Sequence, residues 1–430
     1  MTIKNHIRVN QITIKNNRID YCYEITGDII KYFNLDQQLF IEYEHDITNT
    51  PAGIAIIPFL TNILPIVWLS DTEIFLEDID KRFFNSLDGI KKGYEGMYPG
   101  LLFKGNLVVK NIIDFQYESN LKSAAFFSGG VDSTSTLIRR IHEKPDLLTI
   151  WGSDLLHDHV SGWQKVKQLV ENTSNRFNLK HVFIKSNFRS FINYKTLDND
   201  FKEKLNDNWW HGIQHGIGII GHAAPISFQN GYGKIYMPST RSKKDQQKLP
   251  CASDPTIDNM VRFGETVVEH EGYDYSRQDK IKQIIDYKEQ YQEKIDLRVC
   301  WKSKKGDNCC DCEKCARTIM GLISDGAEPS EFGFEISEND LYRIRDKVKK
   351  DWCFSEIEMT LWNDIQCNMS RNKENIIIKD SIKWILTYDF LKTNKSLLKK
   401  VRNRFNRKEL KRFIYKIIKS LLKGVVPVRQ

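Results

Sequence analysis

A short apolar run that ends in small and polar residues is the clearest feature of the hydrophobic pattern. Residues 124–127 are four consecutive apolar positions, which are typical of a buried strand. Ser128, Gly129 and Gly130 interrupt the run, and the pattern then predicts a helix over residues 131–142. The sequence therefore predicts a strand, a turn of small residues and a helix in direct succession.

Strands and helices alternate after this point. Further strands are predicted at residues 146–151, 181–185 and 234–238, and helices at 159–176 and 201–224. Alternation at this spacing is typical of a parallel sheet with helices on both faces. The expected fold class is α/β, with a doubly wound, Rossmann-like parallel sheet as its core.

The carboxyl ends of the predicted strands are followed by small and polar residues. In an open parallel sheet, ligands bind beyond these ends. The segments 128–133, 152–154 and 239–242 each follow a predicted strand, so we expect them to converge on one site. Gly152 and Asp154 are therefore candidates for contacting a nucleotide or substrate.

The segments on either side of this region have a different pattern. Weak alternation predicts an N-terminal mixed α/β module over residues 1–116, ahead of the alternating region at 117–328. Residues 329–430 are expected to form a helical C-terminal extension. The most apolar run, residues 53–69, contains two prolines and is shorter than the ~20 residues that span a bilayer. We interpret it as buried core.

The glycines at residues 216–221 fit the Gly-x-Gly-x-x-Gly pattern of a dinucleotide-binding turn. No predicted strand precedes them, so the strand-to-helix context of that motif is missing. We therefore expect these glycines to permit close packing of a helix against the sheet.

The basic residues of the chain are concentrated at its end. The net charge is +8, but residues 391–430 hold fourteen Lys and Arg and one acidic residue, Glu409, a local balance of +13 that leaves −5 for residues 1–390. The body of the protein thus has no basic bias that would indicate a nucleic-acid binder. Apolar residues recur at three- and four-residue steps over residues 408–425, which predicts a basic amphipathic helix. Its partner is open: the protein's own body, an anionic membrane surface, or an acidic protein or nucleic acid.

Five of the nine cysteines lie close together in the sequence. Cys300, Cys309, Cys312 and Cys315 give the spacing Cys-x8-Cys-x2-Cys-x2-Cys. Four thiolates form a closed zinc site, which is usually structural. An iron–sulfur cluster is the alternative, and Cys310 could replace Cys309 as a ligand. The clustering, the odd total and the lack of a signal-peptide pattern lead us to expect reduced thiols and a cytoplasmic protein, with the membrane surface as an alternative for the tail.

The turn after the first strand suits an anion. Gly129 and Gly130 can adopt positive φ and let an anion approach the backbone, and the following helix adds partial positive charge. The hydroxyls of Ser128, Ser133 and Thr134 add donors. The chemistry of the turn therefore predicts a phosphate site.

Asp132 is an unusual residue for an anion site unless a divalent cation bridges it to phosphate. We therefore expect pyrophosphate and magnesium here. Asp254 and Asp258 could assist magnesium or recognise an amine, or could be a helix N-cap and a solvated helix residue. Four basic residues are candidates for binding phosphate or carboxylate, and no spacing singles one out: Lys243, Lys244, Arg262 and Arg277.

The residues Ser128-Gly129-Gly130-Val131-Asp132-Ser133-Thr134 resemble the SGGxDS signature of the PP-loop ATPases, and no Walker A pattern occurs. With Leu137, Cys300-Trp301, the cysteine trio and Ala316-Arg317, the chain resembles the 7-cyano-7-deazaguanine synthase branch of that superfamily. This resemblance covers about residues 120–325.

The resemblance implies an enzyme that transfers AMP from ATP to a carboxylate and releases pyrophosphate. Ammonia or an amine then attacks, which gives an amide or a nitrile. The implied cofactors are ATP, Mg²⁺ and Zn²⁺. The implied catalytic residues are Ser128, Asp132 and Ser133, and the implied nucleotide-binding residues are Ser128, Gly129, Gly130, Val131, Asp132, Ser133, Thr134, Gly152 and Asp154.

The substrate is open, because residues 1–116 and 326–430 have no counterpart in the compact synthase and its deazaguanine-binding positions cannot be matched here. Enlarged relatives of that synthase occur in bacterial antiviral-defence and surface-polysaccharide gene clusters. Two other functions are alternatives: a tRNA-modifying PP-loop enzyme, which would need a tRNA-binding surface, and a non-catalytic nucleotide-sensing subunit of a complex.

Overall fold

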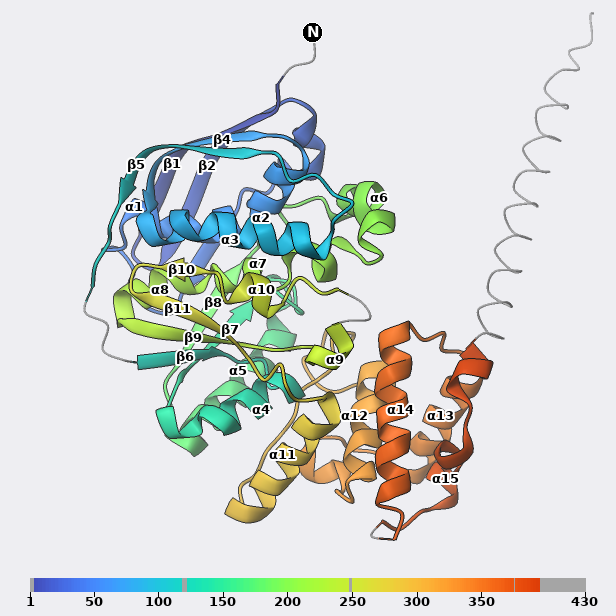
Figure 1. Ribbon diagram of the computed structural model, residues 1–430. Coiled ribbons are helices and arrows are strands. Elements are labelled where there is room, and N and C mark those ends of the chain that lie inside the picture. Colours follow the sequence, from blue (N-terminus) through green and yellow to red (C-terminus); the bar gives the residue numbers. More distant parts are fainter. Residues whose placement is uncertain (1–3, 118–121, 247–249, 375, 395–430) are drawn as a thin grey trace, which may run out of the picture. The chain divides into compact units, whose positions relative to one another are not determined.

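A sheet of eleven strands is the central element of the part of the chain that the computed structural model describes, which is residues 4–117, 122–246, 250–374 and 376–394 (Figure 1). In spatial order across the sheet, the strands are β10 (Arg262–Phe263), β11 (Thr266–Glu271), β9 (Tyr232–Pro238), β6 (Lys122–Phe126), β7 (Asp146–Trp151), β8 (His181–Ser186), β3 (Phe40–Tyr43), β2 (Arg18–Thr26), β1 (His6–Lys15), β4 (Glu73–Asp80) and β5 (Asn106–Ile113).

The middle of this sheet is parallel. β11, β9, β6, β7 and β8 pair in parallel, and four of them are the predicted strands, within two residues of their expected bounds. The sheet does not end there, because β3 pairs with β8 in antiparallel orientation. β2, β1 and β10 also form antiparallel pairs. The fold is therefore α/β, with a mixed and mostly parallel sheet.

Two hydrophobic cores flank the parallel strands, because neighbouring residues on a strand point to opposite faces. Leu147 in β7 belongs to a core with α4 (Val131–Arg140) and α5 (Val160–Phe177). Leu148, the next residue, belongs to the larger core with α2 (Ile57–Leu69) and α8 (Ala223–Asn230). Helices therefore cover both faces of this part of the sheet.

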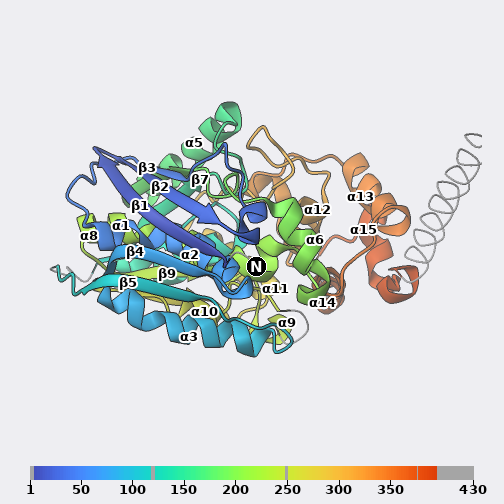
Figure 2. The ribbon, with the colours of Figure 1, turned by 90° about the horizontal axis from the view of Figure 1, so that it is seen from above.

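The leading residues continue the same sheet (Figures 1 and 2). In β3, Ile41 pairs with Ser186 and Tyr43 with Ile184 of β8. The apolar run at residues 53–69 forms α1 (Ala52–Ala55) and α2, and α2 is buried along nearly its whole length, which confirms its interpretation as core. Helix α3 (Lys81–Met97) packs on β4 and β5.

The predicted helix over residues 201–224 is wrong as a single element. The chain instead forms α6 (Tyr194–Leu205), a π-helical turn (Trp210–Gln214), α7 (Ile217–Ile220) and α8. A Cβ at Gly218 would lie 2.7 Å from Asn62 Oδ1, and one at Gly221 would lie 1.9 Å from Thr61 Oγ1. Both partners are on α2, so these glycines permit close contact with a helix of the leading segment rather than with the sheet.

The described chain divides into two compact units. Unit 1 comprises Met1–Leu322 and Ala327–Glu335, and unit 2 comprises Ile323–Gly326 and Ile336–Gln430. Unit 1 holds the whole sheet, whereas the described part of unit 2 is helical. Its elements are α13 (Glu338–Lys350), α14 (Glu356–Arg371), α15 (Asp380–Lys383) and η5 (Trp384–Thr387). Residues 1–116 and the alternating region share unit 1, and the three-part domain division remains a prediction.

The remaining helices are short or lie near the carboxyl ends of the strands. They are η1 (Asp28–Tyr32), η2 (Ile141–Glu143), α9 (Lys243–Gln246), α10 (Pro255–Asp258), α11 (Arg277–Tyr291), α12 (Glu313–Ser324) and η4 (Pro329–Phe332). The basic helix predicted at 408–425 lies outside the described residues. Among the described residues, no helix has the length and apolar character needed to cross a membrane.

Candidate active site

The segment between β6 and α4 has the predicted geometry: the strand ends at Phe126, and the helix begins at Val131. Gly129 has a φ of 74°, and a Cβ there would lie 2.3 Å from Leu169 Cδ2. Only glycine fits this position without strain. Gly130 is the N-cap of α4 and provides no side-chain cap. The first N–H groups of the helix therefore have no intrahelical acceptor and can bind an anion.

Two serine hydroxyls lie together at this helix terminus. Ser128 Oγ and Ser133 Oγ are 3.3 Å apart, and Ser133 Oγ donates to Gly130 O at 3.1 Å. Ser128 is exposed, whereas Val131, Ser133 and Thr134 are buried. Of the predicted loop hydroxyls, Ser128 is thus the one most open to a ligand.

Asp132, on the first turn of α4, is ion-paired with two cations of α11. Arg277 Nη1 lies 3.1 Å from Asp132 Oδ2, and Lys280 Nζ lies 3.4 Å from Oδ1. Burial by itself would raise the pKa of Asp132, but the charges of Lys280 and Arg277 together lower it, so the carboxylate is ionised at neutral pH. Because two cations share one carboxylate, a net positive charge remains beside the turn at residues 128–130.

Both cations are held firmly inside the protein. The side chain of Lys280 is 2% exposed and that of Arg277 is 8% exposed. Lys280 Nζ also donates to Ser239 O at 2.5 Å, and Arg277 Nη2 donates to Thr318 Oγ1 at 3.4 Å. Burial lowers the pKa of Lys280, and the charge of Asp132 offsets part of this effect. Ser239 directly follows β9, so Lys280 links the end of this strand to Asp132.

A capping box sets the start of α11. Ser276 accepts a hydrogen bond from Asp279 N, and Asp279 Oδ2 accepts one from Ser276 N at 2.9 Å. The helix therefore begins at a defined residue. Arg277 and Lys280 are three positions apart and so lie on one face of the first turn. Arg277 was a sequence candidate, whereas Lys280 was missed. The Ser-x-x-Asp pattern at 276–279 predicts a helix start, and it could have placed both cations together in the first turn of that helix.

Gly152 and Asp154 follow β7. Gly152 has a φ of 129°, and a Cβ there would lie 1.8 Å from Ser186 O at the end of β8. The side chain of Asp154 is exposed, yet it is surrounded by enough protein that burial by itself would raise its pKa. Lys314 and Arg298 outweigh burial and lower the pKa of Asp154, so it too is ionised. Lys314 also contributes to the lowered pKa of Asp132. The charge of this lysine therefore acts on both carboxylates, one beyond the end of β6 and one beyond the end of β7.

Arg298 joins the loop to the cysteine segment. Its backbone N–H donates to Gly129 O at 2.7 Å, and its side-chain Nε donates to Gly306 O at 3.1 Å. Gly306 lies between Cys300 and Cys309. The sequence pattern had no signal for this contact, because it joins two segments that are far apart in the chain.

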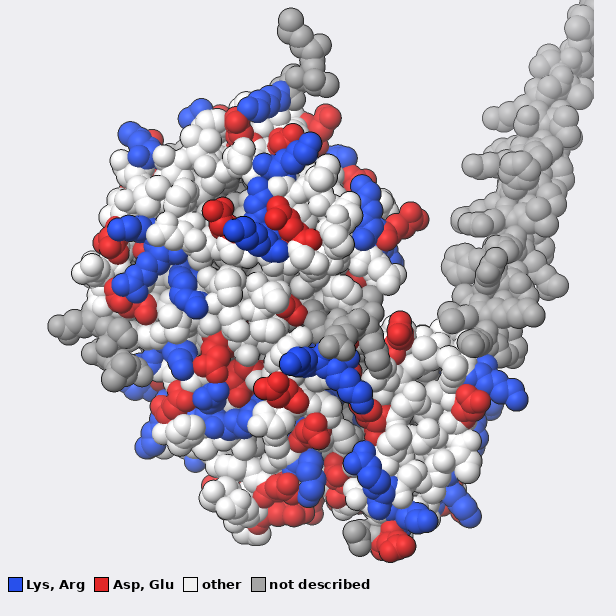
Figure 3. All heavy atoms as spheres, in the orientation of Figure 1, with Lys and Arg blue, Asp and Glu red and all other residues white. Residues whose placement is uncertain are grey.

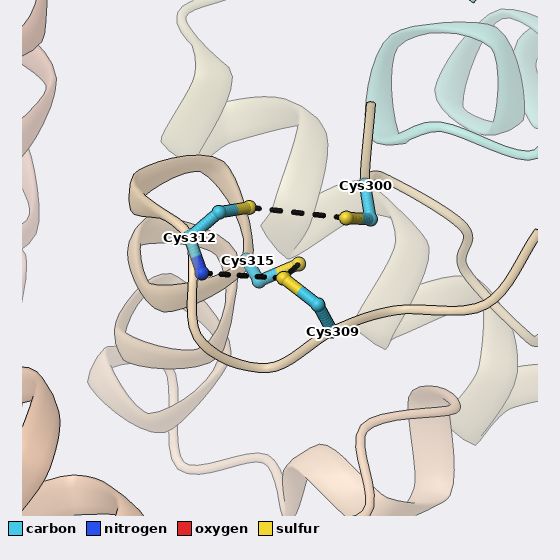
Figure 4. Close-up of side chains that lie close together, drawn as sticks. All are labelled: Cys300, Cys309, Cys312 and Cys315. Carbon is cyan, nitrogen blue, oxygen red and sulfur yellow. Dashed lines mark hydrogen bonds between the residues drawn. The ribbon is translucent and has the colours of Figure 1, made fainter. Parts of the chain in front are cut away.

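Four cysteines lie around one point (Figure 4). The sulfurs of Cys300, Cys309, Cys312 and Cys315 all lie within 4.8 Å of one another, with Cys300–Cys312 and Cys309–Cys315 at 3.9 Å. Four sulfurs bound tetrahedrally at ~2.3 Å from one ion are about 3.8 Å apart. The group can therefore hold a single metal ion such as zinc. An iron–sulfur cluster would spread the thiolates over several irons.

The spare cysteine is not part of this group. Cys310 Sγ contacts Asn308 O at 3.8 Å, and Cys309 takes the ligand position. Lys314 lies between Cys312 and Cys315 in the sequence. A metal bound to these cysteines would therefore fix the position of Lys314, whose charge acts on Asp132 and Asp154. The described cysteines form no disulfide.

Comparisons with known proteins gave no significant match. No family model matches it. No curated protein and no solved structure matches it significantly either. The resemblance to the PP-loop ATPases therefore rests on the sequence motifs alone.

Three of the other sequence candidates have structural partners, whereas Lys243 and Lys244 are exposed on α9. Asp254 is the N-cap of α10 and accepts from Thr256 N at 2.8 Å. Asp258 Oδ2 lies 2.8 Å from His270 Nδ1 and 2.9 Å from Ser253 Oγ, and its side chain is fully buried. The helix-cap interpretation of Asp254 is therefore confirmed, whereas Asp258 is a buried partner of His270 and not a solvated residue. Arg262 donates to the carbonyl oxygens of Asn259 and Val261.

Proposed function

We propose that this protein binds ATP at residues 128–134 and transfers AMP to a carboxylate, with release of pyrophosphate. The observation that carries the proposal is the pairing of a glycine turn at a helix N-terminus with Arg277 and Lys280. Backbone N–H groups and buried cations are the groups that stabilise phosphate oxygens as negative charge develops on them. The parallel order β8-β7-β6-β9-β11, with the loop after the middle strand, also supports a doubly wound nucleotide-binding core.

The reaction proposed here needs no nucleophile from the protein. A substrate carboxylate oxygen attacks the α-phosphorus of ATP, and the bond between that phosphorus and the oxygen bridging to the β-phosphorus breaks. Pyrophosphate leaves with this electron pair, and its charge is stabilised by Arg277, Lys280 and the N–H groups of α4. Ammonia or an amine then attacks the carbonyl carbon of the acyl adenylate and displaces AMP. The nitrogen loses a proton and the product is an amide. Where ammonia is the nucleophile, the oxygen of the primary amide can attack a second ATP and release pyrophosphate; loss of AMP, which carries that oxygen away, and of two protons from nitrogen then gives a nitrile.

In this proposal, Asp154 contacts the other end of the nucleotide or the incoming amine. Its carboxylate is ionised and exposed at the end of β7, so it can accept a hydrogen bond from an amino group. The cysteine group has no role in the bonds that change. Four thiolates leave no coordination position for water or substrate, so the metal would be structural.

A nucleic-acid modifier remains a second class of function. On the face shown in Figure 3, Lys and Arg side chains are interspersed with Asp and Glu over the described residues, and no large patch of one sign is seen. A tRNA-binding surface requires clustered positive charge. This face therefore favours a small substrate or a peptide over tRNA.

Pyrophosphate release tests the proposal. The purified protein would be incubated with ATP, ammonium and a panel of aliphatic, aromatic and heteroaromatic carboxylates, and pyrophosphate and AMP would be quantified. We expect both products in equal amounts with at least one carboxylate, and their loss in Lys280→Met. Lys282→Met, an exposed change on the same helix, is the matched control and should retain the activity. ATP binding without pyrophosphate release for the whole panel would favour a nucleotide-sensing subunit instead.

A further inference from the structure

The carboxylate that a magnesium ion is expected to use is already occupied by cations. Asp132 Oδ2 contacts Arg277 Nη1 at 3.1 Å, and Asp132 Oδ1 contacts Lys280 Nζ at 3.4 Å. A magnesium ion binds its oxygen ligands at about 2.1 Å with near-octahedral geometry. Bound directly to either oxygen, it would be a close neighbour of a buried guanidinium or ammonium group. The contacts of Asp132 therefore do not fit direct ligation of magnesium.

We infer that Asp132 is a positioning residue that holds Arg277 and Lys280 beside the loop, and that these two cations bind the terminal phosphates of ATP and the leaving pyrophosphate. This inference deepens the proposed function and rests on it for the identity of the ligand. It explains the presence of Asp132 beside an anion site without a metal ion bound to its carboxylate oxygens.

Each cation retains donors for a phosphate. Arg277 uses Nη1 for Asp132 and Nη2 for Thr318, and its Nε has no partner among the described residues. A guanidinium carries five N–H donors, so several remain. Lys280 uses two of its three donors, on Asp132 and on Ser239 O. The pair can therefore keep its contacts with Asp132 while it binds phosphate oxygens.

Asp132 is needed because the two cations repel each other, as the effect of the Arg277 charge in lowering the pKa of Lys280 indicates. Both side chains are almost fully buried, where charges are poorly screened by solvent. Asp132 lies between them and neutralises part of the charge before the ligand arrives. The capping box at Ser276 fixes the helix turn that carries both, so the carboxylate only has to orient the ends of their side chains.

The first experiment compares magnesium dependence. The dissociation constant of ATP would be measured by calorimetry in EDTA and in magnesium, and the ratio of the two constants compared between wild type and Asp132→Asn. We expect the variant's ratio to equal that of wild type within about twofold, because magnesium binds the phosphates and not Asp132. A wild-type ratio above ten that falls to about one in Asp132→Asn would overturn the inference.

The second experiment uses inorganic pyrophosphate in EDTA as the probe. Charge-assisted hydrogen bonds from Arg277 and Lys280 should be lost in Arg277→Gln and Lys280→Met, each weakening pyrophosphate binding about 10- to 100-fold. Lys282→Met on the exposed face of α11 should bind as wild type does. Unchanged binding in both test variants would overturn the inference.

Thermal unfolding covers the case in which Asp132→Asn is too unstable for calorimetry. Asp132→Asn leaves two buried cations without a counter-charge, so its melting temperature should fall. Adding Lys280→Met removes one of them and should restore part of that loss. Strictly additive losses would contradict the inference. A protein that passes all three tests but releases no pyrophosphate with any carboxylate contradicts the proposed reaction alone.

Discussion

At the scale of single residues, the loop after β6 depends on a backbone conformation that only glycine adopts easily. We expect Gly129→Ala to destabilise the protein by at least ~2 kcal/mol, because alanine pays about 1–2 kcal/mol at positive φ and would also displace Leu169. ATP or pyrophosphate affinity should fall with it. Gly96→Ala is the control, since a Cβ there meets nothing within 4 Å and α3 should gain up to ~1 kcal/mol. Denaturant unfolding of both variants gives the comparison, and equal stabilities would contradict the requirement for glycine.

A buried histidine predicts how stability depends on pH. His222 Nδ1 lies 2.8 Å from Gly218 O and Nε2 lies 3.0 Å from Ser186 Oγ, and burial lowers the pKa of His222 to about 4. In the unfolded chain the pKa is ~6.5. Between these values the unfolded state binds a proton that the folded state does not, so stability falls as the pH falls from 6.5 to 4. The expected loss at pH 5 is about 2 kcal/mol.

Urea unfolding at pH 7 and pH 5 measures this loss. His222→Phe should be less stable at pH 7 but should show a pH difference smaller by about 2 kcal/mol. His142→Gln, which changes an exposed ring, should keep the wild-type difference. If the two variants showed the same pH difference, His222 would not be the responsible group.

At the scale of elements, the start of α11 links stability to anion binding. Ser276→Ala removes the capping box and should cost about 1 kcal/mol. It should also weaken pyrophosphate binding, because the first turn carries Arg277 and Lys280. Ser355→Ala removes a similar box from α14 in unit 2 and should cost a similar amount of stability without changing pyrophosphate affinity. Calorimetry and urea unfolding of the pair would separate the two effects, and equal affinities would contradict the link.

The cysteine loop is the second element with a testable role. Cys312→Ser should lose the metal and much of the soluble protein, because binding at a four-thiolate site is worth on the order of 10 kcal/mol. Cys310→Ser is the matched control and should retain one metal ion per chain. Elemental analysis of both proteins is the measurement. Iron with acid-labile sulfide, or metal loss from the Cys310 variant, would contradict a four-cysteine zinc site.

At the scale of the whole molecule, the leading 116 residues are part of unit 1 and its largest core. A chain of residues 117–430 would expose the edge of β8 and the apolar face of the sheet that α2 covers, so we expect it to be insoluble. A chain of residues 1–335 keeps every described strand of the sheet and should unfold cooperatively. Soluble expression and thermal unfolding of the two truncations test this, and a folded 117–430 chain would show that the central region needs no leading segment.

The sequence predicted those features that depend on residues close together in the chain, and not those that depend on contacts between distant segments. Strand β6, the turn and α4 were readable because periodicity and small residues are local signals. The antiparallel pairing of β3 with β8 was not, since no local pattern states which distant strand will pair. Asp132 was recognised as anomalous, but its partners come from α11, and only the structure selects Arg277 from the basic candidates. Cys309 was preferred over Cys310 by spacing, and the geometry agrees.

The contact between β3 and β8 also has a consequence for biosynthesis. Phe40 N donates to the side chain of Asn187, 147 residues further along the chain. At a synthesis rate of ~5–20 residues per second, β3 leaves the ribosome roughly 7–30 s before its partner strand. During that interval its edge is open, and neighbouring nascent chains on a polysome carry the same unpaired strand. Production at high ribosome density should therefore favour aggregation, and slower initiation or a chaperone bound to the leading strands should raise the yield of folded protein.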